Sequence, residues 1–240
     1  MGPATAFQWY HRGVRTIEDA LALPGLQKQQ EVGLKYFKDL TTPIPRATVE
    51  RIAALVLQHL QEMDAGFTCE IVGGYRRGKS ACGDVDLLIS HPIEGREHGV
   101  INDITDRLKE KGIIQHVFNA YRPPDPALVQ GKRHPGGQFD ALEKAYVICV
   151  VPGEDPPVHR QLDLIVAPHS QYGTAMLGWS GNTQYERSLR SYADKVKNAK
   201  FASHGLFIGP HRDQRLTFET EEQVLAWLDL PILPPHLRNC

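Results

Sequence analysis

Apolar residues recur every three or four positions in several segments of the chain, which predicts amphipathic helices. The clearest helix runs from Ala47 to Met63, and its apolar stripe consists of Val49, Ile52, Ala53, Val56, Leu57 and Leu60. We also predict helices over Ile101–Lys109, Thr183–Asn198 and Glu221–Leu230. Each is long enough to bury one face against a neighbouring layer.

Short apolar runs between these helices, bounded by Gly, Pro and Asp, predict β-strands. We expect five of them in one part of the chain: Thr68–Val72, Val85–Ile89, Ile113–Phe118, Lys144–Val151 and Gln161–Ala167. A small hairpin pair is expected from Leu206–Ile208 and Arg215–Phe218. Because helices and strands are mixed, the sequence predicts an α+β fold.

The first 45 residues predict short helices. Gly2-Pro3 opens the first, Thr16 with Asp19 caps the second, and the third covers Gln27–Leu40. Such a unit can present backbone amides to a phosphate backbone, or serve as a small helical cap; the pattern leaves both open. The segment Thr42-Pro-Ile-Pro45 is a rigid joint, because residues before Pro avoid the helical conformation.

Four segments break the periodic pattern and predict irregular structure. His91–Gly99 is a loop, and Gly178-Trp-Ser-Gly181 is predicted to be a tight turn. Asn119–Asp140 is rich in polar residues, Pro and Gly, and loops of this length are usually functional or disordered. Pro231–Cys240 is a Pro-rich tail.

Composition removes several classes of protein. The 240 residues include 27 Lys and Arg against 28 Asp and Glu, so a general polyanion binder is excluded and nucleic acid would have to meet local basic faces. The four cysteines have no C-x-x-C spacing, which argues against a disulfide framework or a zinc site. No run of about 18 apolar residues and no signal-peptide pattern occurs, so we expect no membrane association.

Candidate chemistry concentrates in Gly73–Asp86, a glycine-rich turn with three basic residues followed by two aspartates at i and i+2. Side chains alternate along a strand, so Asp84 and Asp86 point to the same side and repel each other unless a divalent cation lies between them. Gly73–Ser80 also satisfies the P-loop pattern literally. That alternative requires a long helix immediately afterwards, and the strand-like run from Val85 leaves no room for one.

A third carboxylate lies in a later strand. Phosphoryl transfer between nucleotides uses two cations about 3.5–4 Å apart, held by carboxylates from neighbouring strands. Asp163 sits inside the apolar run Gln161–Ala167, where an unpaired carboxylate would be costly. An outward-facing strand residue is the alternative for Asp163 alone; beside Asp84 and Asp86, we predict a catalytic triad of carboxylates.

These motifs resemble those of the family X DNA polymerases. Gly73–Pro92 resembles the palm signature, and Gln161–Pro168 and Gly178–Asn182 match later motifs in the same order. Trp9-Tyr10, Arg15–Asp19 and Gly33–Phe37 resemble the helix-hairpin-helix subdomain. Phe139–Glu143, Ser203–Phe207 and the ending Leu233–Cys240 are most similar to the polymerase mu and terminal transferase branch, and a fungal member is the narrower expectation.

The resemblance implies three domains and a set of site residues. The domains are a helix-hairpin-helix at 1–45, a nucleotidyltransferase palm with a mixed sheet at 46–170, and a nucleotide- and template-contacting α/β subdomain at 171–240. Catalysis and metal binding fall to Asp84, Asp86 and Asp163. Nucleotide binding falls to Gly73, Gly74, Arg77, Cys82, Gly83, Asp84, Asp86, Gly178, Trp179, Gly181 and Asn182. DNA binding falls to Arg187, Arg190 and His204, although the basic helix that carries the two arginines could equally be a solvated face.

The implied activity is a DNA-directed DNA polymerase that uses Mg²⁺, or Mn²⁺, to add dNTPs to a primer 3′-hydroxyl in gap filling and end joining. Gly178 stands where relatives that exclude ribonucleotides carry tyrosine, so we expect rNTPs to be used as well. A nuclear monomer is expected. Competing hypotheses are a terminal transferase, a nucleotidyltransferase acting on RNA ends or a small molecule, and a DNA-binding fragment with little turnover.

Four features depart from the family pattern. Pro43 replaces a triphosphate-contacting arginine, and Gln161 replaces an arginine two residues before Asp163. Gly83 replaces a histidine of the mu and terminal transferase pattern, which argues against template-independent addition. The chain also starts within the helix-hairpin-helix, so we expect a trimmed catalytic core whose end-joining factors would bind through N-terminal domains that precede it.

Overall fold

The computed structural model describes residues 2–121 and 141–239. The chain separates into two compact units, Met1–Thr42 and Pro43–Cys240. The first contains α1 (Pro3–His11), α2 (Ile17–Leu21), α3 (Lys28–Lys35) and α4 (Phe37–Thr41). Thr16 caps α2 as predicted: its hydroxyl accepts from the Asp19 amide at 3.1 Å, and the Asp19 carboxylate accepts from the Thr16 amide at 2.9 Å.

The predicted single helix over Gln27–Leu40 is wrong in one respect, because it is two helices. Tyr36 leaves the helical conformation with φ −103° and ψ 17°, and it ends α3 and begins α4. Neither Pro nor Gly marks this break, so the sequence pattern does not reveal it.

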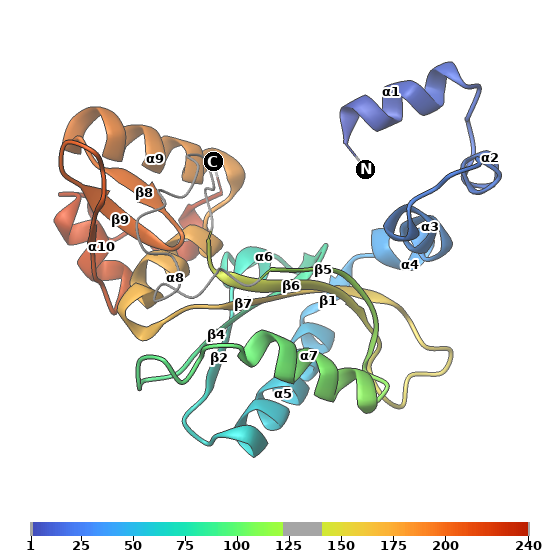
Figure 1. Cartoon of the computed structure of the whole chain (residues 1–240), viewed down its shortest axis with the longest axis horizontal. Coiled ribbons are helices and arrows are strands. Elements are labelled where there is room, and N and C mark those ends of the chain that lie inside the picture. The colour runs from blue at the N-terminus through green and yellow to red at the C-terminus, as the bar shows by residue number, and fades with distance from the viewer. Residues whose placement is uncertain (1, 122–140, 240) are drawn as a thin grey trace. The chain divides into compact units, whose positions relative to one another are not determined.

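The second unit is built on a five-stranded sheet (Figure 1). Its strands are β2 (Thr68–Ile71), β4 (Val85–Ser90), β5 (Ile114–Tyr121), β6 (Glu143–Cys149) and β7 (Arg160–Val166), in the spatial order β2-β4-β7-β6-β5. Only β4 and β7 pair in parallel, and Asp86 is the register partner of Asp163. The mixed sheet and all five predicted strands are therefore confirmed. Of the predicted loop over Asn119–Asp140, residues 119–121 belong to β5 and the rest lies outside the described residues.

The two faces of this sheet carry different partners. Helices α5 (Arg46–Met63) and α7 (Val100–Glu110) cover one face, where alternate residues of β4 and β7, such as Leu87 and Leu164, are fully buried. The opposite face packs Leu88 and Ile165 against α8 (Tyr172–Ser180). Because side chains alternate along a strand, Asp86 and Asp163 fall on this second face.

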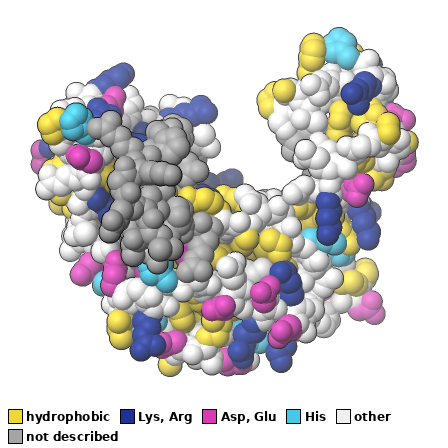
Figure 2. All heavy atoms as spheres, viewed as in Figure 1, with side chains coloured by type: hydrophobic (Ala, Val, Ile, Leu, Met, Phe, Trp, Pro, Cys, Tyr) yellow, Lys and Arg dark blue, Asp and Glu magenta, His cyan; other side chains and the backbone are white. Residues whose placement is uncertain are grey.

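The outer surface of α5 and α7 carries acidic and basic side chains interspersed (Figure 2). Arg107 of α7 pairs with Glu62 of α5, and Lys109 pairs with Asp106 at 2.9 Å within α7. Exposed ion pairs of this kind contribute little stability. The two helices together carry four Lys and Arg against five Asp and Glu, so they have no excess of positive charge.

The C-terminal part of the second unit has its own apolar core. It contains α9 (Thr183–Lys197), β8 (Lys200–Ala202), β9 (Gly205–Ile208), β10 (Gln214–Leu216), α10 (Glu221–Trp227) and a short 3₁₀ turn, Pro235–Leu237. The three strands form an antiparallel meander in the order β10-β9-β8. The predicted hairpin is confirmed; β8 was missed because three residues are too few to show a period.

The predicted tight turn at Gly178–Gly181 is wrong, because Gly178–Ser180 are the last residues of α8. This helix was not predicted. It is buried on several sides, with Ala175 and Met176 against the large sheet and Leu177 in the C-terminal core. A helix covered on several sides has no polar stripe, so its sequence shows no amphipathic period. Gly173 is required for the close packing, since a Cβ there would lie 2.3 Å from the Thr220 carbonyl oxygen.

Two short strands complete the second unit, β1 (Ile44–Pro45) and β3 (Ala81–Cys82), which pair antiparallel. Ile44–Pro45, at the end of the predicted first domain, thus belongs to the second unit. The sequence from Ser80 continues directly into β3 and β4, and the only helix of the Gly73–Ser80 motif is the four-residue α6 (Gly73–Arg76) inside it. The context required for a P-loop is missing here, as predicted.

Candidate active site

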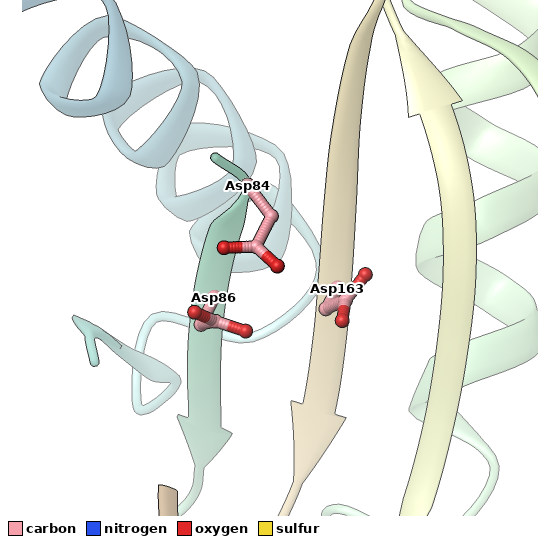
Figure 3. A group of neighbouring side chains, drawn as sticks. All are labelled: Asp84, Asp86 and Asp163. Carbon is pink, nitrogen blue, oxygen red and sulfur yellow. The ribbon is translucent and has the colours of Figure 1, made fainter. Parts of the chain in front are cut away.

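Three carboxylates meet on the α8 face of the large sheet (Figure 3). Asp84 directly precedes β4, Asp86 lies in β4, and Asp163 lies in the neighbouring parallel strand β7. One oxygen from each lies within 4.8 Å of the others. In the described parts of the chain, no other group of three His, Cys, Asp or Glu residues is arranged in this way.

The site is electrostatically unfavourable without a cation. Burial, together with the charges of Asp84 and Asp163, raises the pKa of Asp86 to about 8, against the effect of Arg77. Burial also raises the pKa of Asp163 to about 7, helped by Asp84 and opposed by the Gln161 amide, which donates to Asp163 Oδ1 at 3.1 Å. Mg²⁺ and Mn²⁺ prefer sites whose ligand atoms are all oxygens, and a bound cation would also relieve the repulsion between these carboxylates. The three aspartates therefore fit the metal that the family resemblance implies.

Gly73 allows the glycine-rich turn to lie directly against the Asp86 carboxylate. Its φ of +58° is left-handed, and a Cβ there would lie 1.8 Å from Asp86 Oδ2. The Gly73–Ser80 turn is braced from α5 by Arg46, whose Nη1 donates to the carbonyls of Tyr75 at 2.9 Å and Lys79 at 3.0 Å. The turn is therefore held close to the carboxylates.

A pocket of about 350 Å³ opens beside Asp84 and Asp86. Its cationic side chains are Arg77, Lys79 and Arg190. The remaining lining residues come from the glycine-rich turn, the end of α8 and the start of α9: Gly73, Gly74, Gly83, Gly178, Trp179, Gly181, Thr183 and Glu186. Cationic groups beside clustered carboxylates suit a phosphorylated ligand that carries a divalent cation.

Comparison with known proteins agrees with this geometry. Residues 43–169 match the family model described as the DNA polymerase beta palm, residues 175–239 the DNA polymerase beta thumb, and residues 1–41 the fingers domain of DNA polymerase lambda. The chain belongs to the family X DNA polymerases. These three matches cover nearly all of the chain, so the α+β family X core predicted from the sequence is confirmed.

Individual relatives give the same result. Human DNA-directed DNA/RNA polymerase mu is 34% identical over 255 residues, covering 100% of this chain and 50% of the relative. Rat DNA polymerase lambda is 34% identical, covering 99% of this chain and 40% of the relative. DNA nucleotidylexotransferase of Xenopus laevis is 29% identical, covering 100% and 50%. This family X chain thus spans about half the length of the curated relatives it matches.

The structure brings most of the predicted nucleotide-binding residues into the one pocket: Gly73, Gly74, Arg77, Gly83, Asp84, Asp86, Gly178, Trp179 and Gly181. Two others lie differently. Cys82 is only 2% exposed and packs into the main core, and Asn182 caps α9 by accepting from the Tyr185 amide at 2.8 Å. Their side chains serve the fold around the pocket.

The three predicted DNA-binding residues are separated. Arg190 lines the pocket and lies 3.4 Å from Glu186, between Nη2 and Oε2. Arg187 is exposed on another face of α9, where it shares a shallow hollow with Lys195. His204 lies in the β8–β9 turn, and its Nδ1 accepts from the Ala141 amide at 3.1 Å.

Three further pocket residues, Lys79, Thr183 and Glu186, were not assigned to the site from the sequence. Lys79 stood in the glycine-rich turn and could have been included on charge alone. Thr183 and Glu186 lie in the first turn of α9, whose start at Thr183 was predicted correctly, but no local pattern shows which side chains of that turn line the pocket. Burial raises the pKa of Glu186 to about 8, against Arg190 and Arg238. Its Oε1 occupies the space beside Gly181, where a Cβ would lie 2.4 Å away.

The carboxylate triad predicts a pH-dependent response to metal. The pKa values of Asp86 and Asp163 are raised from 3.8, to about 8 and about 7, so without divalent ions their contribution to stability is greatest in acid and is lost as pH rises toward about 8. Mg²⁺ should therefore raise the melting temperature more at about pH 8 than at about pH 6. Differential scanning fluorimetry tests this. Equal shifts at both pH values would contradict it, and Asp86→Asn/Asp163→Asn should remove the difference.

Proposed function

We propose that this chain is the catalytic core of a DNA polymerase that transfers a nucleotide to a primer 3′-hydroxyl. The observation that carries the proposal is the triad Asp84, Asp86 and Asp163 beside a pocket containing Arg77 and Lys79. The relatives named as DNA polymerases mu and lambda support the same chemistry. The names of these relatives also favour DNA as the acceptor of the nucleotide, rather than an RNA end or a small molecule.

The residues of the site would have distinct roles in this reaction. Asp84 and Asp86 would hold both cations, and Asp163 would complete the site for the cation at the primer 3′-hydroxyl. These Mg²⁺ or Mn²⁺ ions supply Lewis acidity and neutralise phosphate charge. Arg77 and Lys79 bind triphosphate oxygens, while Trp179 and Gly181 form the wall beside the sugar. Gln161 orients the Asp163 carboxylate through its hydrogen bond.

The finer assignments extend the same proposal. The helical unit at 1–42 and α9, with Arg187 and Arg190, would contact gapped or broken DNA. The palm would span 43–170, which includes β1, and the nucleotide-selecting subdomain 171–240. The setting would be nuclear gap filling and end joining by a monomer, with end-joining factors recruited by other parts of a longer protein. No helix in the described residues is sufficiently long and apolar to cross a bilayer.

Extension of a labelled primer on a gapped duplex tests this function directly. Wild-type chain with Mg²⁺ or Mn²⁺ and dNTPs is expected to extend the primer, and chelation should stop it. DNA binding by the same preparation is measured in parallel. Binding without extension under any metal would identify a DNA-binding fragment instead, and equal extension of single-stranded primer would identify a terminal transferase.

Sugar selection provides a second, more specific test. Gly178 lines the pocket without a side chain, and a Cβ there would lie 3.0 Å from Ser203 Cβ and 3.1 Å from Ser203 Cα. A pocket that has no side chain to meet an added hydroxyl rejects the hydroxyl-bearing analogue by about 100-fold or less. We expect kcat/KM for dATP to exceed that for ATP by no more than about this factor. A much larger preference for dATP, measured with matched templates, would refute the assignment of Gly178.

A further inference from the structure

The last residues of the chain fold back onto the turn that carries Arg76 and Arg77. We define residues 231–239 as the C-terminal tail. His236 Cβ lies 3.7 Å from the position that a Cβ at Gly78 would take, so the tail passes directly beside the turn. The Arg238 carbonyl also accepts from the Asn182 amide at 3.3 Å, which joins the tail to the start of α9.

Arg238 anchors this tail in the interior. It is 0% exposed, and it donates from Nη1 to Glu221 Oε2 at 2.8 Å and from Nε to the Leu233 carbonyl at 2.8 Å. Glu221 also accepts two bonds from Arg76, at 2.7 Å to Oε1 and 3.0 Å to Oε2. Burial raises the pKa of Glu221, but the bonds from Arg76 and Arg238 outweigh it and the net pKa is lowered. One carboxylate therefore joins the tail to the glycine-rich turn.

The next residue of the tail meets the next arginine of the turn. Arg77 Nε donates to Asn239 Oδ1 at 3.0 Å, and Asn239 Nδ2 donates back to the Arg77 carbonyl at 3.4 Å. Arg77 Nη1 donates to the Gly181 carbonyl at 3.0 Å. Among the described residues, none accepts from Nη2, and Arg77 lines the pocket. Two of its three nitrogens are held by protein, and the third remains for a ligand.

We infer that the C-terminal tail positions Arg77 for the triphosphate of the incoming nucleotide, with Asn239 as the positioning residue and Arg238 as its anchor. The inference rests on the proposed function. Holding Nε and Nη1 in place fixes the plane of the guanidinium before the ligand arrives, so less conformational freedom is lost on binding. Loss of Asn239 should therefore weaken triphosphate binding without changing the chemical step.

Asn239→Ala is the test variant, because Arg238→Ala would leave Glu221 buried with fewer partners and could unfold the region. We expect the KM for dNTP to rise about threefold to tenfold with kcat unchanged, which is the effect of losing one hydrogen bond of ordinary strength at an exposed position. Asn239→Asp keeps the acceptor for Arg77 Nε and should stay closer to wild type. Ile232→Ala, at a tail residue 63% exposed, is the matched control and should leave KM unchanged.

A double-mutant cycle separates positioning from general loosening of the structure. In an Arg77→Ala background, Asn239→Ala should have no further effect, because the residue it orients is missing. Calorimetric binding of inorganic triphosphate with Mg²⁺ gives a readout without catalysis, and Asn239→Ala should weaken it by the same factor. An unchanged dissociation constant, or an additive effect in the Arg77→Ala background, would overturn the inference. If wild type binds triphosphate but extends no primer, the proposed function fails while the binding cycle still decides the role of the tail.

Discussion

Replacing Asp163 by Ala should abolish primer extension while leaving the folded chain at least as stable in the absence of metal. Removing one fixed group that stabilises developing charge typically costs about 100- to 1,000-fold in rate. Asp163 is buried, and its pKa is raised to about 7, so its charge is unfavourable to the apo fold. Losing that charge should relieve repulsion within the triad. The measurement is single-nucleotide incorporation on a gapped duplex, paired with a thermal melt.

Two further variants make this result specific. Asp163→Asn keeps the side-chain volume and removes only the charge, so it should lose activity almost as completely as Asp163→Ala. Asp106→Asn changes an aspartate of α7 whose side chain is 69% exposed and should extend normally. Incorporation by Asp163→Ala within about tenfold of wild type would show that the triad is not the reacting centre.

Gly73→Ala should be nearly as damaging, although it removes no charged group. The new Cβ would lie 1.8 Å from Asp86 Oδ2 and 2.7 Å from its Cγ, so the carboxylate has to move. Displacement of a catalytic group by about 1 Å can cost about 100-fold in rate. The left-handed φ of +58° adds a cost of about 1–2 kcal/mol to stability. Primer extension and chemical denaturation measure the two effects separately.

Gly112→Ala is the matched control for the backbone part of this prediction. Gly112 has a φ of +69°, and nothing lies within 4 Å of the position its Cβ would take. It follows α7, on the opposite face of the sheet from the carboxylates. It should therefore lose a similar amount of stability and keep its activity. Similar activity in the two variants would mean that Asp86 tolerates the intrusion.

The local sequence was sufficient to predict the helices and strands that have a clear hydrophobic period, and to predict the three carboxylates of the site. The apolar stripe of α5 reflects one buried face, which is visible without a structure. Asp84 and Asp86 could be placed together because two residues along a strand bring side chains to the same side.

The incorrect predictions have a common cause: these features are determined by tertiary packing, which leaves no pattern in the local sequence. Helix α8 is buried against both the large sheet and the C-terminal core, so its composition resembles that of a strand or a turn. The break at Tyr36 has no Pro or Gly to signal it. Thr183 and Glu186 were overlooked although the start of α9 was predicted correctly, because no local pattern shows which side chains of its first turn face the pocket. The hydrogen bond between the tail and the turn joins residues 162 positions apart, which no local rule predicts.

The parallel pairing of β4 with β7 makes Asp86 and Asp163 direct register partners. A slip of one residue between these strands would turn Asp163 toward α5 and α7 and put Leu162 or Leu164 in its place. Only the native register can then gather three carboxylates around a cation. Divalent ions should consequently act as selective ligands for correctly paired chains during refolding, so that Mg²⁺ improves the yield of native protein as well as its stability.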